Sequence, residues 1–214
     1  MRKFLSVPFF LLVACSNINA MPIDNYPKQL TKNCGDGLAD LYDECADQLT
    51  ILKQAINDAK QQPNKRILIV YGAEWCIWDH VFHKYIQGKV GEFNYQWRDN
   101  TGEFSKWQML EQVSNEQYQD AKALNQFVAD NFIVVNIEAE KSNGNEIFKR
   151  IGAKQTYHYP AIMVLDKQGK HRATMPAGSE IVGLEIRESG GQEYRGYDRK
   201  ILLNELKKLR KDAE

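Results

Sequence analysis

The chain has 214 residues, of which 43% are hydrophobic and 26% are charged, and its 28 basic and 28 acidic side chains give a formal net charge of zero. This size and composition are ordinary for a globular protein and suffice for a leader followed by one domain with a sizeable core. The balanced charge and the lack of a basic stripe in the sequence argue against nucleic-acid binding.

The first twenty residues have the pattern of an export signal. Met1–Lys3 is basic and precedes an apolar run over 4–14 that is too short to span a bilayer as a stable helix. The sequence Leu-Val-Ala-Cys over 12–15 resembles a bacterial lipobox, which implies cleavage before Cys15 and lipid attachment to its sulfur. Ordinary signal cleavage after Ala20 is the alternative. Both interpretations predict export to the periplasm, and acylation would add a membrane anchor.

A polar segment separates the leader from the first predicted helix. Residues 21–37 contain two prolines and show no periodicity, which predicts a flexible tether. From Leu38 to Gln62, apolar residues recur at spacings of three and four, as expected for the buried face of a helix. We therefore expect the folded domain to begin near Leu38.

Four cysteines constrain the chemistry. If Cys15 carries lipid, three remain, and an oxidising compartment favours one disulfide and one free thiol. Cys34 and Cys45 are the expected pair, because they are close in sequence across a Gly-Asp-Gly turn, and such a bridge stabilises the fold by about 3 kcal/mol in the chain-entropy model. Cys76 is then the free thiol, although exchange between it and the other two stays open.

The rest of the chain alternates strands and helices. Strands are predicted over 66–71, 132–137, 161–165 and 170–175, and helices over 76–86, 115–131, 146–151 and 198–211. This order predicts an α/β domain over 38–211 with a mixed central sheet flanked by helices. The aromatic-rich segment over about 88–112 is expected as an insertion, either a β-hairpin or another aromatic-rich excursion. We expect its aromatic side chains to pack on the domain, and a partner-recognition patch is the alternative.

The strand over 66–71 leads into the sequence Ala-Glu-Trp-Cys-Ile-Trp-Asp-His, which ends at His80. Cys76 falls in the first turn of a helix, where unpaired N–H groups and the helix dipole favour a thiolate. The carboxylate of Asp79 opposes this effect, because it disfavours a second negative charge nearby. A protonated His80, on the same helical face as Cys76, would offset Asp79 and restore some thiolate.

Together with Tyr159-Pro160, which directly precedes the strand over 161–165, this motif resembles the thioredoxin-like superfamily, especially exported bacterial thioredoxin-related proteins. The resemblance covers roughly 38–211 and implies a thioredoxin-like fold. It implies that Cys76 is the attacking cysteine, that Trp75 packs beside it, and that Tyr159 and the cis-proline Pro160 bind substrate backbone. Asp79 occupies the position of the resolving cysteine, so this chain has Cys-x-x-Asp where the family has Cys-x-x-Cys.

These features predict a monothiol thiol–disulfide oxidoreductase that acts through Cys76 on exported proteins with thiols or disulfides. No cofactor is implied, and an external thiol would resolve the mixed disulfide. A second hypothesis is a non-catalytic thioredoxin-fold module that binds or assembles partners at the membrane. A third is metal binding by Cys76, Asp79, His80 and His83, but their spacing is not a zinc signature, and we assign no metal site.

Overall fold

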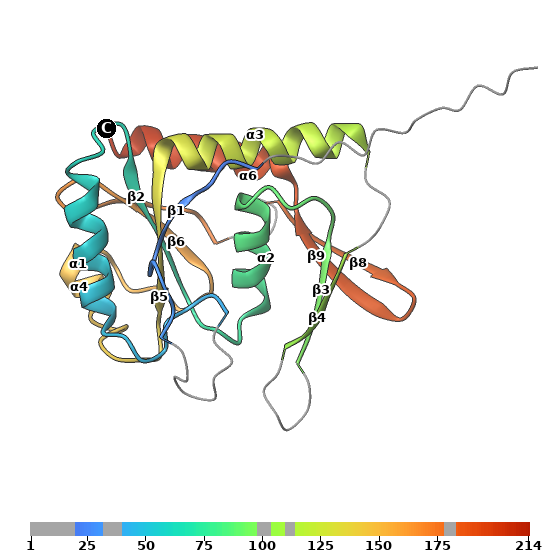
Figure 1. Ribbon diagram of the computed structural model, residues 1–214, viewed down its shortest axis with the longest axis horizontal. Coiled ribbons are helices and arrows are strands. Elements are labelled where there is room, and N and C mark those ends of the chain that lie inside the picture. Colours follow the sequence, from blue (N-terminus) through green and yellow to red (C-terminus); the bar gives the residue numbers. More distant parts are fainter. Residues whose placement is uncertain (1–19, 32–39, 98–103, 110–113, 178–182) are drawn as a thin grey trace, which may run out of the picture.

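The computed structural model describes residues 20–31, 40–97, 104–109, 114–177 and 183–214, with the backbone alone over 95–97 and 104–109 (Figure 1). The expected leader with Cys15, and also Cys34, lie outside these residues. The helices are α1 (Gln48–Ala59), α2 (Ile77–Ile86), α3 (Asn115–Asn131), α4 (Ile147–Ile151) and α6 (Arg199–Asp212). The strands are β1 (Asp24–Tyr26), β2 (Arg66–Gly72), β3 (Phe93–Trp97), β4 (Phe104–Met109), β5 (Phe132–Glu138), β6 (Ala161–Leu165), β7 (His171–Thr174), β8 (Leu184–Ser189) and β9 (Gln192–Tyr197). None of the described helices combines the length and the apolar character needed to cross a membrane.

A mixed five-stranded sheet forms the centre of the molecule, in the order β1-β5-β2-β6-β7. Strands β1 and β2 each pair with β5 in parallel, whereas β6 pairs antiparallel with both β2 and β7. Helices flank this sheet (Figure 1). The predicted α/β class with a mixed central sheet is therefore confirmed.

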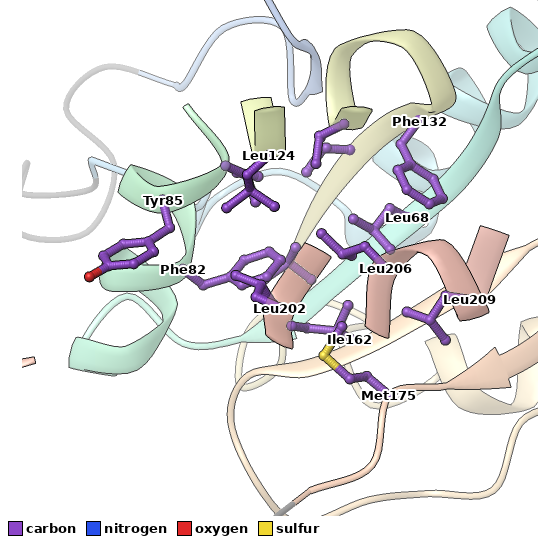
Figure 2. Close-up of a cluster of buried hydrophobic side chains, with 14 of the residues drawn as sticks. Leu68, Phe82, Tyr85, Leu124, Phe132, Ile162, Met175, Leu202, Leu206 and Leu209 are labelled. Carbon is purple, nitrogen blue, oxygen red and sulfur yellow. The ribbon is translucent and has the colours of Figure 1, made fainter. Parts of the chain in front are cut away.

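Both faces of the central sheet are buried, which explains why its inner strands are nearly continuous apolar runs. On one face, Ile67, Ile69 and Tyr71 of β2 pack with side chains of α1 and α4. On the other face, Leu68 and Val70 pack with side chains of α2, α3 and α6. Figure 2 shows this second cluster, in which helix side chains converge on the sheet around Leu68.

Short polar motifs set the ends of several helices. The Ser114 side chain accepts the backbone N–H of Gln117, whose own side chain accepts the Ser114 N–H, and this capping box starts α3. Asp198 accepts the N–H groups of the first turn of α6. Gly152 ends α4 with φ of 74°, a left-handed conformation that glycine adopts without steric cost.

The aromatic-rich segment forms the hairpin β3–β4, and this hairpin is half of a second sheet. Its order is β4-β3-β9-β8, so the later hairpin β8–β9 completes it. We did not predict β8 or β9. The ring of Tyr197, at the end of β9, packs against Trp78, Phe82 and Tyr85, which attaches this sheet to α2.

Helix α1 begins at Gln48, and the expected start at Leu38 is wrong. Carboxylates take the backbone N–H groups that a helix over 40–46 would need for itself. Glu74 accepts the N–H groups of residues 40–42, and Asp43 accepts those of Cys45 and Ala46. The segment therefore runs as a series of bends, and Asp47 caps the helix that follows.

Strand β1 lies within the segment that we expected to be a flexible tether, so that expectation is wrong for Asp24–Tyr26. This strand pairs in parallel with residues 133–135 of β5. The Tyr26 side chain is buried, and its hydroxyl donates to the carboxylate of Asp58 on α1. Three residues at a sheet edge are too few to show a periodicity in the sequence.

Candidate active site

Cys76 lies at the N-terminus of α2, one turn after the end of β2. Its N–H donates to the Ala73 carbonyl at 2.9 Å, and its carbonyl accepts the N–H of Asp79 at 3.1 Å. It is the N-cap residue of α2, but its side chain makes no capping hydrogen bond. The thiol is free, and the residue is only 6% exposed. Cys76 is therefore fixed in place and largely shielded from solvent.

Asp79 is fully buried next to Cys76, and its Oδ2 atom is held by two donors. The Ala73 N–H donates to Oδ2 at 2.8 Å, and the Tyr42 hydroxyl donates to it at 3.0 Å. The other oxygen, Oδ1, has no well-formed hydrogen bond among the described residues. Cys76 lies at the start of the same helical turn, and the two side chains perturb each other's protonation: the charge of Asp79 raises the pKa of the thiol, and the thiol lowers that of the carboxyl group.

Burial controls the protonation of this pair. Removal from solvent, and secondly the charge of Asp79, raise the pKa of the Cys76 thiol to about 12. The N–H groups of Trp78 and Asp79 lower that pKa, but by less than burial raises it. Burial also raises the pKa of Asp79, to about 8. The expected helix N-terminal effect is present, but it does not make Cys76 a thiolate at neutral pH.

His80 does not supply the positive charge that we expected. Its Nε2 atom lies 2.6 Å from the Glu74 carbonyl oxygen and 3.3 Å from the Glu74 carboxylate. Burial lowers the pKa of His80 to about 4, and it does the same for His83, so both rings are neutral at pH 7. His80 therefore positions the turn before Cys76 through a hydrogen bond and does not offset the charge of Asp79.

A second layer of buried carboxylates lies behind this pair, and sequence reasoning missed its role. Glu74 is 6% exposed and accepts three backbone N–H groups from residues 40–42. Its own N–H donates to Glu138, at the end of β5, at 2.8 Å. Burial raises the pKa of Glu74 and of Glu138 to about 7 in each case. In the sequence, Glu138 directly follows the apolar strand over 132–137, and this position was the signal that could have marked it as a site residue.

The Tyr159-Pro160 segment lies beside the turn that carries Cys76. The antiparallel register pairs Tyr71 of β2 with Ala161 of β6, so Pro160 sits at the end of β2 from which that turn begins. The Tyr159–Pro160 peptide bond is cis. Burial and the nearby acidic groups, Cys76 among them, raise the pKa of Tyr159. The structure therefore brings the proline loop to the thiol.

Trp75 forms the exposed rim of this site. It is 52% exposed, and its ring centroid lies 5.8 Å from that of Tyr159. Its Nε1–H donates to Glu140 at 3.1 Å. Tyr159 and Pro160 also line a cavity of about 160 Å³ with largely apolar walls. This cavity is lined by Trp78, His158, Tyr159, Pro160, Ile162, Met175, Pro176, Ala177, Leu184 and Tyr197.

Metal binding by Cys76, Asp79, His80 and His83 stays an untested hypothesis. The described residues contain no group of three or more His, Cys, Asp or Glu side chains that could hold a metal ion.

Cys45 is disulfide-bonded, whereas Cys76 is free. Pairing of Cys45 with Cys34 stays a prediction, because Cys34 lies outside the described residues.

Comparisons with protein-family models, with curated proteins and with solved structures found no match to this chain. A free thiol beside a buried carboxylate, next to a cis-proline loop and an exposed tryptophan, has the groups needed for thiol–disulfide exchange. The same groups, with the thiol kept protonated, also suit the binding of a peptide without reaction.

Proposed function

We propose that this chain is an exported protein with a thioredoxin-like fold that carries out monothiol thiol–disulfide exchange through Cys76. The observation that carries the proposal is that the free thiol of Cys76 and the buried carboxylate of Asp79 lie together at the start of α2. Two features support the fold assignment. The thiol lies at the start of the helix after the central strand β2, and the cis-proline precedes the neighbouring antiparallel strand β6.

Asp79 acts as the proton carrier in this proposal. Its ionised form accepts the proton of Cys76 while the sulfur attacks a disulfide of the substrate, and Cys76 becomes joined to one substrate sulfur. The other substrate sulfur leaves as a thiolate and takes the proton from Asp79. A carboxyl group whose pKa is raised to about 8 is close to the pH at which such transfers are efficient.

The mixed disulfide needs a second thiol, because Asp79 cannot resolve it. We propose that a thiol from outside the domain attacks this bond, restores Cys76 with a proton, and leaves with the substrate sulfur in a new disulfide. The substrates are exported proteins that carry thiols or disulfides. Their backbone would lie along Pro160, between the exposed rim at Trp75 and the apolar cavity.

A non-catalytic binding module is the second candidate function, and a specific observation favours it. Cys76 is 6% exposed and the pKa of its thiol is raised to about 12, so few molecules carry a thiolate at neutral pH. In this candidate function the proline loop and Trp75 bind a partner, and Cys76 only fills space.

The Asp79→Asn variant distinguishes these two functions. Removal of the carboxylate takes away a charge that raises the thiol pKa, so alkylation of Cys76 should become faster at pH 8. If Asp79 carries the proton, exchange with a disulfide substrate should nevertheless become at least tenfold slower. Glu138→Gln is the matched control, because it removes a buried carboxylate that accepts the N–H groups of Glu74 and Glu140, and it should keep most of the exchange activity.

The two rates should be measured on the full chain, with Cys76→Ser as the blank. Alkylation is followed by peptide mass and exchange by release of a coloured thiol from an aromatic disulfide. Exchange no faster than the blank, with a Cys76 that reacts only after unfolding, would overturn the redox proposal in favour of the binding module.

Membrane attachment through Cys15 is a separate part of the proposal. The Cys15→Ala variant should leave the membrane fraction, and its mature N-terminus should be Met21. Retention of Cys15→Ala in the membrane, or an N-terminus at Met21 in the unchanged protein, would show that Cys15 carries no lipid.

A further inference from the structure

Strand β8 forms the outer edge of the second sheet. Its inner side pairs with β9, and no described strand pairs with its outer side. Five of its six residues are exposed, and Ile186 in its middle is 61% exposed. An exposed edge of this kind offers unpaired backbone groups to another strand.

The hairpin turn determines which backbone groups face outward. Gly190 and Gly191, with φ of 59° and 76°, form a two-residue turn between Ser189 and Gln192. In such a turn the two flanking residues form a hydrogen-bonded pair, and hydrogen-bonded and non-bonded pairs then alternate along the hairpin. The N–H and C=O groups of Leu184, Ile186 and Glu188 therefore point away from β9.

We propose that a second copy of this chain pairs with β8, antiparallel and about a two-fold axis at Ile186. In this register Ile186 lies opposite Ile186 of the second copy. The two residues form a hydrogen-bonded pair, because the N–H and C=O groups of Ile186 point outward. It also places Glu185 opposite Arg187 of the second copy, and Arg187 opposite Glu185. Those are non-bonded positions, where side chains of adjacent strands approach most closely.

The charges of β8 select this register over its neighbours. A shift of two residues in one direction would place Glu185 opposite Glu185, and a shift in the other direction would place Arg187 opposite Arg187. Like charges directly opposite each other destabilise a strand pair. Charged residues usually protect an edge from pairing, but here their order is complementary to itself.

Arg187 remains accessible to the second copy. Arg187 pairs with Glu92 at 2.9 Å within the chain, but its side chain remains 58% exposed and keeps free N–H donors. Leu184, on the same strand, lines the cavity beside Pro160. The second copy would therefore lie next to the candidate active site.

Cysteine cross-linking of the full chain tests the two-fold axis. In Ile186→Cys the two introduced residues face each other with Cα atoms about 5.5 Å apart, a distance that a disulfide can span. In Ser189→Cys, the matched control, they lie six strand positions or about 20 Å apart. We expect Ile186→Cys to yield at least ten times more disulfide-linked dimer than Ser189→Cys under mild oxidation. Equal yields, or no dimer with Ile186→Cys, would overturn the proposal.

Charge complementation tests the register independently. Glu185→Arg and Arg187→Glu should each weaken dimerisation about tenfold, because each places like charges opposite each other at both paired positions. A one-to-one mixture of the two variants should restore the dimer as a mixed species, since both facing pairs are then Arg with Glu. Sedimentation of each variant and of the mixture gives the result, and a mixture that stays as weakly associated as the separate variants would overturn the proposal.

Discussion

The two sheets of this molecule differ in what holds them together. The central sheet is covered on both faces, and every residue of β5 is buried. In the second sheet, β8 is mostly exposed, and the sheet is attached to α2 largely through aromatic contacts of Tyr197. The central sheet therefore stabilises the fold and positions the candidate site. The second sheet has an exposed edge strand and lines part of the cavity. Four measurements test this difference between the two sheets.

Removal of a buried side chain should show the contrast most clearly. Leu68→Ala should lower the free energy of unfolding by about 2 to 5 kcal/mol, because Leu68 is fully buried in the core cluster of Figure 2. Ile186→Ala, on exposed β8, should change it by less than about 0.5 kcal/mol. Urea unfolding at low protein concentration measures both, and similar losses would contradict the contrast.

The pH dependence of stability should be the next largest effect. The folded-state pKa is raised to about 7 for Glu74 and Glu138 and to about 8 for Asp79, so the folded chain binds more protons than the unfolded chain in this range. The stability that these groups contribute is present below their unfolded pKa values and is lost as pH rises through the folded values. His80 and His83, whose pKa values are lowered to about 4, have the opposite effect, which acts mainly between about pH 4 and 6.5 and fades above it.

Between pH 6.5 and 8.5 the buried carboxylates dominate this slope, and we expect a net loss on the order of 3 kcal/mol. Unfolding by urea at several pH values measures it. Glu138→Gln should flatten the slope, since its side chain does not titrate. A stability that rises over this range would mean that these carboxylates are solvated.

Crowding at Gly72 should have an intermediate effect. A Cβ atom there would lie 1.8 Å from Asp79 Oδ2 and 2.6 Å from the Tyr42 hydroxyl oxygen. Gly72→Ala should therefore cost about 1 to 3 kcal/mol. In an Asp79→Ala background the same substitution should cost less, because the clashing carboxylate is gone. A double-mutant cycle from thermal unfolding gives this difference, and simple additivity would contradict the contact.

Loss of the N-cap of α6, which directly follows β9, should have the smallest effect on stability. Asp198 follows β9 and accepts the N–H groups of Lys200 and Ile201 at the start of α6. Asp198→Ala should cost about 1 kcal/mol, whereas Asp198→Asn, which keeps a cap oxygen, should cost much less. Equal losses in thermal unfolding would mean that the charge matters more than the hydrogen bonds.

The central sheet could be predicted because its signals are local. Residues 66–71 and 161–165 are apolar runs between clear turn residues, and the structure has strands there. The hairpin β8–β9 was missed because charged residues interrupt its pattern, and only the Gly190-Gly191 pair marked its turn. The late start of α1 depends on carboxylates that are distant in sequence, which no local pattern reveals.

The candidate site was predictable in its residues but not in its electrostatics. Cys76 and Pro160 stand out because each lies at the junction of a strand with another element. The raised pKa of the thiol and the neutral His80 result from burial, which depends on the whole fold. Tyr42, which holds Asp79, comes from a segment that we expected to be helical.

Strand β1 also sets how far this domain could stand from a membrane. Because Asp24 already belongs to the central sheet, only eight residues separate it from Cys15. A fully extended chain of that length reaches about 30 Å at most. If Cys15 carries the lipid, the domain is held close to the bilayer surface, and only substrates that come within a few nanometres of that surface can reach Cys76.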